Sequence, residues 1–110
     1  MTDPLERQFE EQVIGLAAIY GWEYIHLRPA KTAHGWRTPV SGTLGMGWPD
    51  WTFVRAKRRR VLFRELKSTT GTVSPDQARV LAFLRSAGQD ADVWRPADMD
   101  SGRILRELGG

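Results

Sequence analysis

The chain has 110 residues, of which 41% are hydrophobic and 26% are charged, so we expect a single globular domain over residues 1–110 and not a disordered chain. Cysteine is absent, which excludes disulfides, thiolate metal sites and cysteine nucleophiles. The net charge of +3 is a mild bias that identifies no partner by itself.

The first half of the chain predicts a helix, a strand and a long loop. Apolar residues recur every three or four positions from Leu5 to Tyr20, which predicts an amphipathic helix. Aromatic and β-branched residues over 22–27 predict a strand. Residues 29–47 contain two prolines and four glycines with little periodicity, so we expect a long flexible loop. Loops of that length in small domains are more often functional than idle.

Two strands, 51–56 and 61–67, follow this loop and are joined by a strongly basic turn. Six cationic residues fall within ten positions here: Arg55, Lys57, Arg58, Arg59, Arg60 and Arg64. Such a cluster can keep a hairpin turn soluble, or it can bind a phosphate backbone. The cluster alone does not distinguish these two interpretations.

The last third predicts a well-marked helix, a short strand and a final helix. Ser74 as N-cap, Pro75 in the first turn and Gln77 closing a capping box open a helix that ends near Gly88. A strand over 92–95 and a helix over 101–108 complete the order αβββαβα. We therefore predict an α/β fold in which helices flank a mixed four-stranded sheet. The residues expected to be buried in these two helices are Ala78, Val80, Leu81, Leu84, Ile104, Leu105 and Leu108.

Charged residues stand at strand ends where a purely structural domain does not need them. Asp50 opens the second strand, and Glu65 and Lys67 end the third on one face, which Val61 and Phe63 extend as an apolar row. If these strands form a hairpin, the two carboxylates and the ammonium converge. Close carboxylates repel unless a cation lies between them, and oxygen ligands suit Mg²⁺ or Mn²⁺. Such a metal promotes phosphodiester hydrolysis.

The structural alternative is that Glu65 and Lys67 pair on a solvent-facing strand and that Asp50 caps a turn. For any one residue this alternative is favoured. Taken together, the three residues and the helix that follows them favour the catalytic interpretation.

These residues resemble a nuclease signature. Pro49-Asp50, followed after about fifteen residues by Glu65-Leu66-Lys67, resembles the PD-(D/E)XK nucleases. The blocks 47–51, 62–67, 74–77 and 87–96 resemble the VRR-NUC branch of that superfamily over about residues 6–96. This branch is similar to archaeal Holliday-junction resolvases and occurs as small stand-alone proteins, often phage-encoded. The resemblance implies a restriction-endonuclease-like fold.

The resemblance also implies roles for individual residues. Asp50 and Glu65 would be metal ligands together with the backbone carbonyl of Leu66, and Lys67 would be the catalytic lysine. Gln77 would position the lysine or the attacking water, unless it only closes the capping box.

A glutamate on the first helix normally completes such a site. Glu6 fits best because it precedes Phe9 in an E-x-x-Φ pattern. Glu10 is the alternative and Glu11 the next. The glutamates that are not used would belong to a solvated helix face.

Basic residues near Asp50 are candidates for nucleic-acid binding. Arg28, Lys31 and Arg37 lie in or beside the long loop with Trp36, a pattern that suits a phosphate backbone or an exposed base. The remaining candidates are those of the basic turn: Arg55, Lys57, Arg58, Arg59 and Arg60. His26 is expected to be a structural histidine at the sheet edge, with phosphate contact as the alternative.

The sequence therefore predicts a Mg²⁺- or Mn²⁺-dependent DNA endonuclease acting on Holliday junctions or other branched DNA. The alternatives are a non-catalytic nucleic-acid-binding module on the same fold, and a nonspecific DNase or RNase. Cutting two strands symmetrically would need a homodimer, to which exposed tryptophans such as Trp22 and Trp94 could contribute.

Nothing in the sequence indicates export or membrane insertion. The apolar run over 13–22 is shorter than the ~18 residues of a membrane span, and the first residues are polar, unlike a signal peptide. We expect a protein of the cytoplasm of a bacterial or phage-infected cell, with no membrane partner.

Overall fold

The structure, a computed structural model, describes residues 4–28, 30–37 and 39–110, and the side chains of residues 30, 31 and 37 lie outside the described part. Its helices and strands are, in chain order, α1 (Pro4–Ile19), β1 (Glu23–His26), β2 (Ala30–Thr32), β3 (Gly35–Arg37), β4 (Trp51–Arg55), β5 (Arg60–Leu66), α2 (Pro75–Ser86), β6 (Asp90–Trp94), α3 (Pro96–Asp100) and α4 (Arg103–Gly109). The 3₁₀ helix η1 (Gly45–Gly47) precedes β4, and η2 (Ala56–Arg58) connects β4 to β5.

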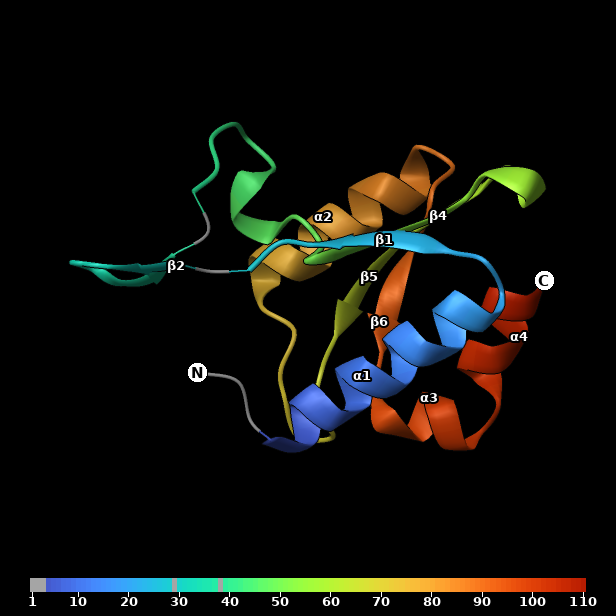
Figure 1. The fold of residues 1–110 in the computed structure, drawn as a ribbon. Helices are drawn as coiled ribbons and strands as arrows, with labels where there is room; N and C mark the ends of the chain where they lie inside the picture. Colours follow the sequence, from blue (N-terminus) through green and yellow to red (C-terminus); the bar gives the residue numbers. More distant parts are fainter. Residues whose placement is uncertain (1–3, 29, 38) are drawn as a thin grey trace.

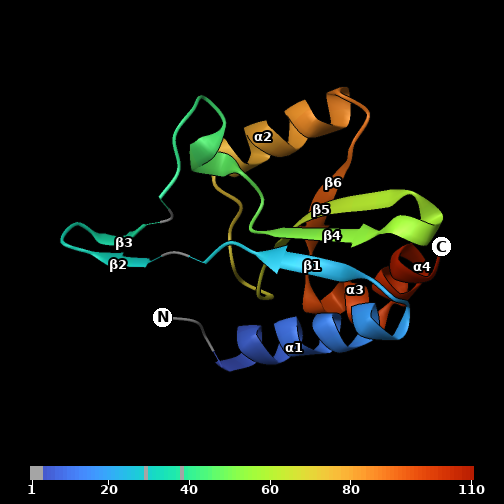
Figure 2. The same cartoon turned by 45° about the horizontal axis from the view of Figure 1, so that its top comes forward.

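A four-stranded sheet forms the centre of the described part, with strand order β1-β4-β5-β6. β4 pairs antiparallel with both β1 and β5, whereas β5 and β6 are parallel because α2 crosses between them. α2 covers one face of the sheet, and α1 and α4 cover the other (Figures 1 and 2). The predicted α/β fold with a mixed, helix-flanked sheet is confirmed. Within the described residues, no helix is long and apolar enough to cross a membrane.

The main core lies between the sheet and the helices α1 and α4. Its buried side chains come from α1, from the residue before β1, from the sheet and from α4: Phe9, Val13, Ala17, Trp22, Trp51, Phe53, Leu62, Leu66, Trp94, Ile104 and Leu108. Two indoles also bind α4, since Trp22 Nε1 donates to the Leu108 carbonyl at 2.7 Å and Trp94 Nε1 donates to Glu107 Oε1 at 3.0 Å. The proposal that Trp22 and Trp94 contribute to a dimer surface was therefore wrong, because they are only 5% and 0% exposed.

The predicted apolar row on β5 lies on the less buried face of that strand. Leu62 and Leu66 point into the main core, whereas Val61 is 38% exposed and Phe63 is half-buried under α2. β5 is a central strand covered on both faces. The alternation of its residues alone therefore could not show which of its two rows of side chains is more deeply buried. Two smaller expectations were also wrong, since Ala78 and Leu105 are exposed while Val80 and Leu81 are buried.

The described residues of the segment predicted as a loop, 30–37 and 39–47, contain regular structure. β2 and β3 pair antiparallel as a hairpin that projects away from the sheet in both views (Figures 1 and 2), and η1 follows it. The hairpin turn is closed locally, because Thr32 Oγ1 accepts from the His34 N–H at 3.1 Å and donates to the Gly35 carbonyl at 2.8 Å. Strands of three residues are too short to give an alternation signal in the sequence.

The C-terminal segment contains two helices where one was predicted over 101–108. α3 begins at Pro96, and the chain turns at Gly102, with φ of 81°, before α4 begins at Arg103. Such a positive φ costs a glycine little, which allows the sharp break between the helices.

A buried cation joins the sheet to α4. Arg64 is 1% exposed, and its Nη2 lies 2.8 Å from both Asp90 Oδ1 and Glu107 Oε1. Its guanidinium also lies 4.9 Å from the centre of the Trp94 ring. Arg64 of the predicted basic cluster is therefore a structural residue and not a surface cation.

We expect Arg64→Ala to lower the free energy of unfolding by about 3–5 kcal/mol, because the partner carboxylates lose their buried cation. Urea denaturation at neutral pH measures this loss. The control is Arg85→Ala, which removes an ion pair between Arg85 and Asp92 whose side chains are 49% and 44% exposed. That control should cost no more than about 1 kcal/mol. Equal small losses in the two variants would contradict the structural role of Arg64.

Candidate active site

The first two candidate residues are brought together by the register of β4 and β5. Trp51 pairs with Arg64, so Asp50, one residue before β4, lies beside Glu65 near the end of β5. The backbone N–H of Asp50 donates to Glu65 Oε1 at 3.2 Å. Two carboxylates that are fifteen residues apart in the sequence thus lie side by side at one edge of the hairpin.

Glu65 is an almost fully buried carboxylate. It is 1% exposed, and its pKa is raised to about 8, first by burial and then by the neighbouring charge of Asp50. Lys67 and the hydrogen bond from Asp50 act in the opposite direction without cancelling these effects. Glu65 therefore favours its protonated form at neutral pH unless a cation compensates its charge.

Asp50 shows the same tendency. Burial raises its pKa, Lys67 lowers it, and Glu6 raises it again. The pKa of Glu10 is raised by burial and by Glu6, and Asp50 adds to the effect, while Arg28 and Arg7 lower it. Burial is thus the main cause of the raised pKa values of Asp50 and Glu10, and the neighbouring carboxylates add to it.

Two of the three candidate glutamates on the first helix lie near enough to Asp50 to interact with it electrostatically. Glu6 and Glu10 are half-buried one turn apart on α1 and interact electrostatically with each other and with Asp50. Glu11 is exposed. Exposure therefore favours Glu6 or Glu10 over Glu11, while the choice between Glu6 and Glu10 stays a prediction.

Lys67 follows directly after β5, and its backbone N–H donates to the Trp94 carbonyl at 3.0 Å. Its side chain is half-buried and lowers the pKa of both Asp50 and Glu65. Within the described residues, no carboxylate lies close enough to form an ion pair with it. The ammonium is therefore near both carboxylates but held by neither.

Gln77 combines the two roles that the sequence left open. Its Oε1 accepts from the Ser74 N–H at 3.0 Å and its own N–H donates to Ser74 Oγ at 3.1 Å, which completes the capping box of α2. Its Nε2 donates to Glu65 Oε2 at 3.4 Å. One side chain thus anchors the helix start and contacts the buried carboxylate.

Gln77→Glu separates these roles, because a carboxylate can still accept from the Ser74 N–H but cannot donate to Glu65. We expect this variant to keep α2 capped and to cut DNA about tenfold more slowly, the scale of one lost hydrogen bond to a charged group. The matched control is Ser74→Ala, which removes the cap, costs about 1 kcal/mol of stability and leaves cleavage unchanged. Single-turnover rates and thermal melts measure both effects. Equal cleavage rates in the two variants would leave Gln77 a capping residue only.

The donor set fits a hard divalent cation in charge and in chemistry. Carboxylate oxygens are the ligands that Mg²⁺ and Mn²⁺ favour, and a bound cation would relieve the repulsion by which Asp50 helps to raise the pKa of Glu65. In the part of the chain that the structure describes, no three His, Asp or Glu side chains lie close enough together to hold a metal ion. Asp50 and Glu65 are neighbours, whereas a third carboxylate, from Glu6 or Glu10, would have to move closer to complete a set of ligands. Leu66 has its side chain in the core, and the metal-binding role of its carbonyl stays a prediction.

The nucleic-acid candidates near this edge are only partly described. Arg28 is exposed, and its Nε donates to His26 Nδ1 at 3.3 Å. His26 stacks on Trp51 with 3.8 Å between ring centres, and burial, aided by Arg28, lowers its pKa to about 4. A neutral histidine that accepts a hydrogen bond supports the structural role. The backbones of Lys31 and Arg37 lie in β2 and β3, while their side chains lie outside the described part.

The basic turn lies at the opposite end of the hairpin from Asp50. The five residues of β4 lie between Asp50 and the basic turn and span about 17 Å at ~3.4 Å per residue. Arg55 and Arg60 donate to the carbonyls of Leu108 and Glu107 at 3.4 and 2.7 Å, at the C-terminal end of α4. Lys57, Arg58 and Arg59 are exposed. Two arginines of the basic turn, Arg55 and Arg60, therefore contact α4, whereas its other three cationic residues are exposed to solvent.

Arg95 is a positioning residue that sequence reasoning missed. Its Nη1 donates to the carbonyls of Ser68 and Gly71, each at 2.7 Å, and so fixes the loop that follows Lys67. Both acceptors are backbone atoms, so no residue type in the sequence indicates these contacts.

A mixed sheet with two carboxylates and a lysine at neighbouring strand ends defines the class of restriction-endonuclease-like nuclease folds. The chain belongs to the VRR-NUC domain family, whose model matches residues 7–98 and so covers most of its length. Comparison with curated proteins and with solved structures gives no match. The family is one of nucleases, so membership indicates hydrolysis of DNA, for which such enzymes typically use divalent metal ions.

Proposed function

We propose that the protein is a Mg²⁺- or Mn²⁺-dependent DNA endonuclease of the PD-(D/E)XK class that acts on branched DNA. The observation that supports this most is the contact between Asp50 and the buried Glu65, whose pKa is raised to about 8. A buried carboxylate beside a second, half-buried one destabilises a small domain unless a cation compensates their charge. A bound metal ion would offset this destabilisation and would give the two carboxylates a role in DNA cleavage.

The chain's own residues have distinct roles in the proposed mechanism. Asp50 and Glu65, with the Leu66 carbonyl and Glu6 or Glu10, would hold the metal. When bound, the metal would acidify a water molecule and stabilise negative charge on the phosphate. Lys67 would donate to the attacking water or to a phosphate oxygen, since its ammonium is near the carboxylates and paired with neither. Gln77 would hold the Glu65 carboxylate in orientation.

DNA would approach along the edge that carries Asp50. Arg28, Lys31 and Arg37 would contact the backbone near the cleavage site, and the exposed Lys57, Arg58 and Arg59 would contact it farther away. Arg55 and Arg60 would contribute mainly through the field of the cluster, because they also bind the end of α4.

We further propose that one domain over residues 1–110 contributes one active site and that a homodimer cuts branched DNA such as Holliday junctions. Symmetric incision of two strands requires two such sites related by a two-fold axis. The expected setting is the cytoplasm of a bacterial or phage-infected cell.

Labelled four-way junction, flap and duplex DNA, each with Mg²⁺, Mn²⁺ or EDTA, test this proposal. We expect metal-dependent paired cuts in the junction and little cutting of duplex. Equal metal-dependent cutting of all three would favour a nonspecific DNase. Binding without cutting under every condition would favour a non-catalytic module.

A further inference from the structure

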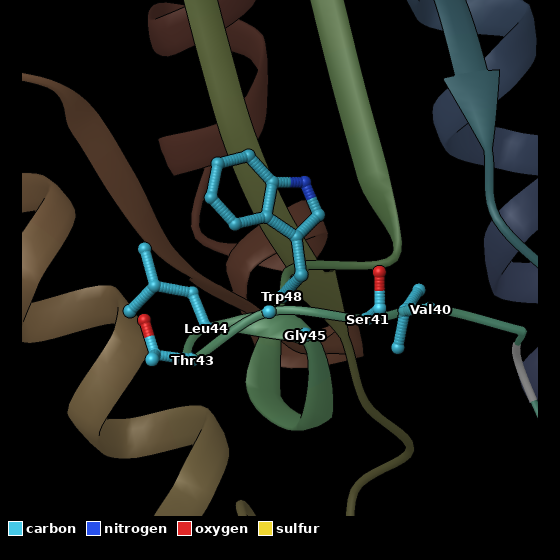
Figure 3. Close-up of a pocket in the computed structure, with 7 residues that line it drawn as sticks. Val40, Ser41, Thr43, Leu44, Gly45 and Trp48 are labelled. Atoms are coloured by element: carbon cyan, nitrogen blue, oxygen red, sulfur yellow. The ribbon is translucent and has the colours of Figure 1, made fainter.

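A pocket lies directly before the proposed metal site in the sequence. It has a volume of about 330 Å³ and is lined by Val40, Ser41, Gly42, Thr43, Leu44, Gly45 and Trp48. In Figure 3 the indole of Trp48 and the hydroxyl of Ser41 project from the same side of this loop, with Leu44 on the other side of the indole. Trp48 is two residues from Asp50, and its ring contacts Phe63, which lies on the same face of β5 as Glu65.

The aromatic wall of the pocket is held firmly. The Trp48 ring meets Phe63 of β5 edge-on, with 5.7 Å between ring centres and an angle of 79°. Gly47 lies so close to the start of α2 that a Cβ there would be 2.2 Å from the Asp76 carbonyl oxygen. Arg79 of α2 donates to the Thr43 carbonyl at 2.7 Å. The loop is therefore fixed to the sheet and to α2 at both ends of the pocket.

The pocket also presents polar groups without partners. Within the described residues, Trp48 Nε1 makes no hydrogen bond, unlike Nε1 of Trp22 and Trp94. The hydroxyls of Ser41 and Thr43 are likewise free of side-chain hydrogen bonds in the described part of the chain, and both residues are exposed. A flat apolar wall with nearby donors and acceptors suits a ring that has polar edges.

We propose that this pocket binds one unpaired nucleobase beside the scissile phosphodiester. This inference rests on the proposed nuclease function. Base stacking on an aromatic side chain is how proteins bind single-stranded nucleic acid, and the hydroxyls suit the base edges. The volume lies at the low end of the ~300–1,000 Å³ of small-ligand sites, which suits one base and excludes a base pair. Duplex DNA keeps its bases stacked, so the pocket favours branched DNA, in which a base at the branch point is unpaired, as in a flap, or can open, as at the crossover of a junction.

The test compares two DNAs in EDTA, where cleavage is absent: a duplex with a five-nucleotide flap and the same duplex without it. 2-Aminopurine is placed at each flap position in turn. We expect fluorescence quenching at one or two positions. Trp48→Ala should weaken flap binding about tenfold and leave duplex binding unchanged. Trp48→Phe should restore part of the flap affinity.

Two further variants guard against a folding defect. Ser41→Phe fills the pocket from the opposite wall without touching the Trp48–Phe63 contact, and it should cause the same selective loss. Met46→Ala changes a residue that is 74% exposed on the same segment but does not line the pocket, and it should bind both DNAs normally.

Quenching that survives in Trp48→Ala, or equal loss of flap and duplex binding in Ser41→Phe, overturns the inference. Failure of the proposed function is a different result, because wild-type protein would then cut neither DNA in Mg²⁺ whatever its binding preference.

Discussion

Replacement of Lys67 by alanine is expected to slow DNA cleavage by about 10²- to 10⁴-fold, the range of a lost proton-transfer or charge-stabilising group. The fold should tolerate this change. Lys67 is half-buried at the end of β5, its backbone N–H still donates to Trp94, and no ion pair is lost within the described residues. Single-turnover cleavage in Mg²⁺, thermal melting and DNA binding in EDTA measure the three effects separately.

Two further variants test whether the effect on cleavage is confined to the proposed site. Asp50→Asn should slow cleavage at least as strongly as Lys67→Ala and should not lower the melting temperature. Lys57→Ala, at the exposed turn about 17 Å away, should leave the cleavage rate unchanged at saturating DNA and weaken binding in a salt-dependent manner. Near-normal cleavage by Lys67→Ala would contradict the mechanism.

The second large effect concerns stability. Glu65→Gln is expected to stabilise the metal-free protein by about 4 kcal/mol at pH 8 and by no more than about 1 kcal/mol at pH 5. The pKa of Glu65 is about 8 in the folded protein against an ordinary value of 4.5. Folding therefore favours the protonated form: the contribution is fully present below pH 4.5 and is lost as the pH rises through 8, at ~1.4 kcal/mol per pH unit. A neutral glutamine avoids this loss.

Urea denaturation in EDTA at pH 5 and pH 8 measures this effect. Mg²⁺ should stabilise the wild-type protein at pH 8 and have no effect on Glu65→Gln, which cannot bind it. Stability of the wild type that does not fall between pH 5 and pH 8 would show that Glu65 is not held protonated.

Glu107→Gln is the control with the opposite sign. Burial alone would raise the pKa of Glu107, but hydrogen bonds from Arg64, Trp94 and Arg103 outweigh burial and lower it. Its carboxylate therefore stabilises the fold above its ordinary pKa, and the glutamine variant should be less stable than the wild type at pH 8. The two variants thus distinguish Glu65, whose charge a metal ion would compensate, from Glu107, whose charge arginines already compensate.

Local rules explain which parts of the fold could be predicted. Ser74, Pro75 and Gln77 specify the start of α2 through contacts within four residues, and the structure contains that capping box. The convergence of Asp50 and Glu65 could be predicted for a similar reason, because a hairpin with a short turn fixes which residues face each other.

Contacts between distant segments explain the errors. Nothing near Arg55 or Arg60 in the sequence shows that the end of α4 will lie against them. The sequence likewise does not show that Trp22 and Trp94 are buried against α4, where oxygen atoms accept hydrogen bonds from both indole N–H groups. The hairpin of β2 and β3 was missed because its stability comes from a few backbone contacts and the Thr32 hydroxyl.

The central claim is that Asp50 and Glu65 form a divalent-metal site, and calorimetric titration of Mn²⁺ into the metal-free protein tests it most directly. We expect one saturable site in the wild type, tighter at pH 8 than at pH 6 because Glu65 must lose its proton, and no such site in Asp50→Asn. Identical binding curves for the wild type and Asp50→Asn would contradict the claim.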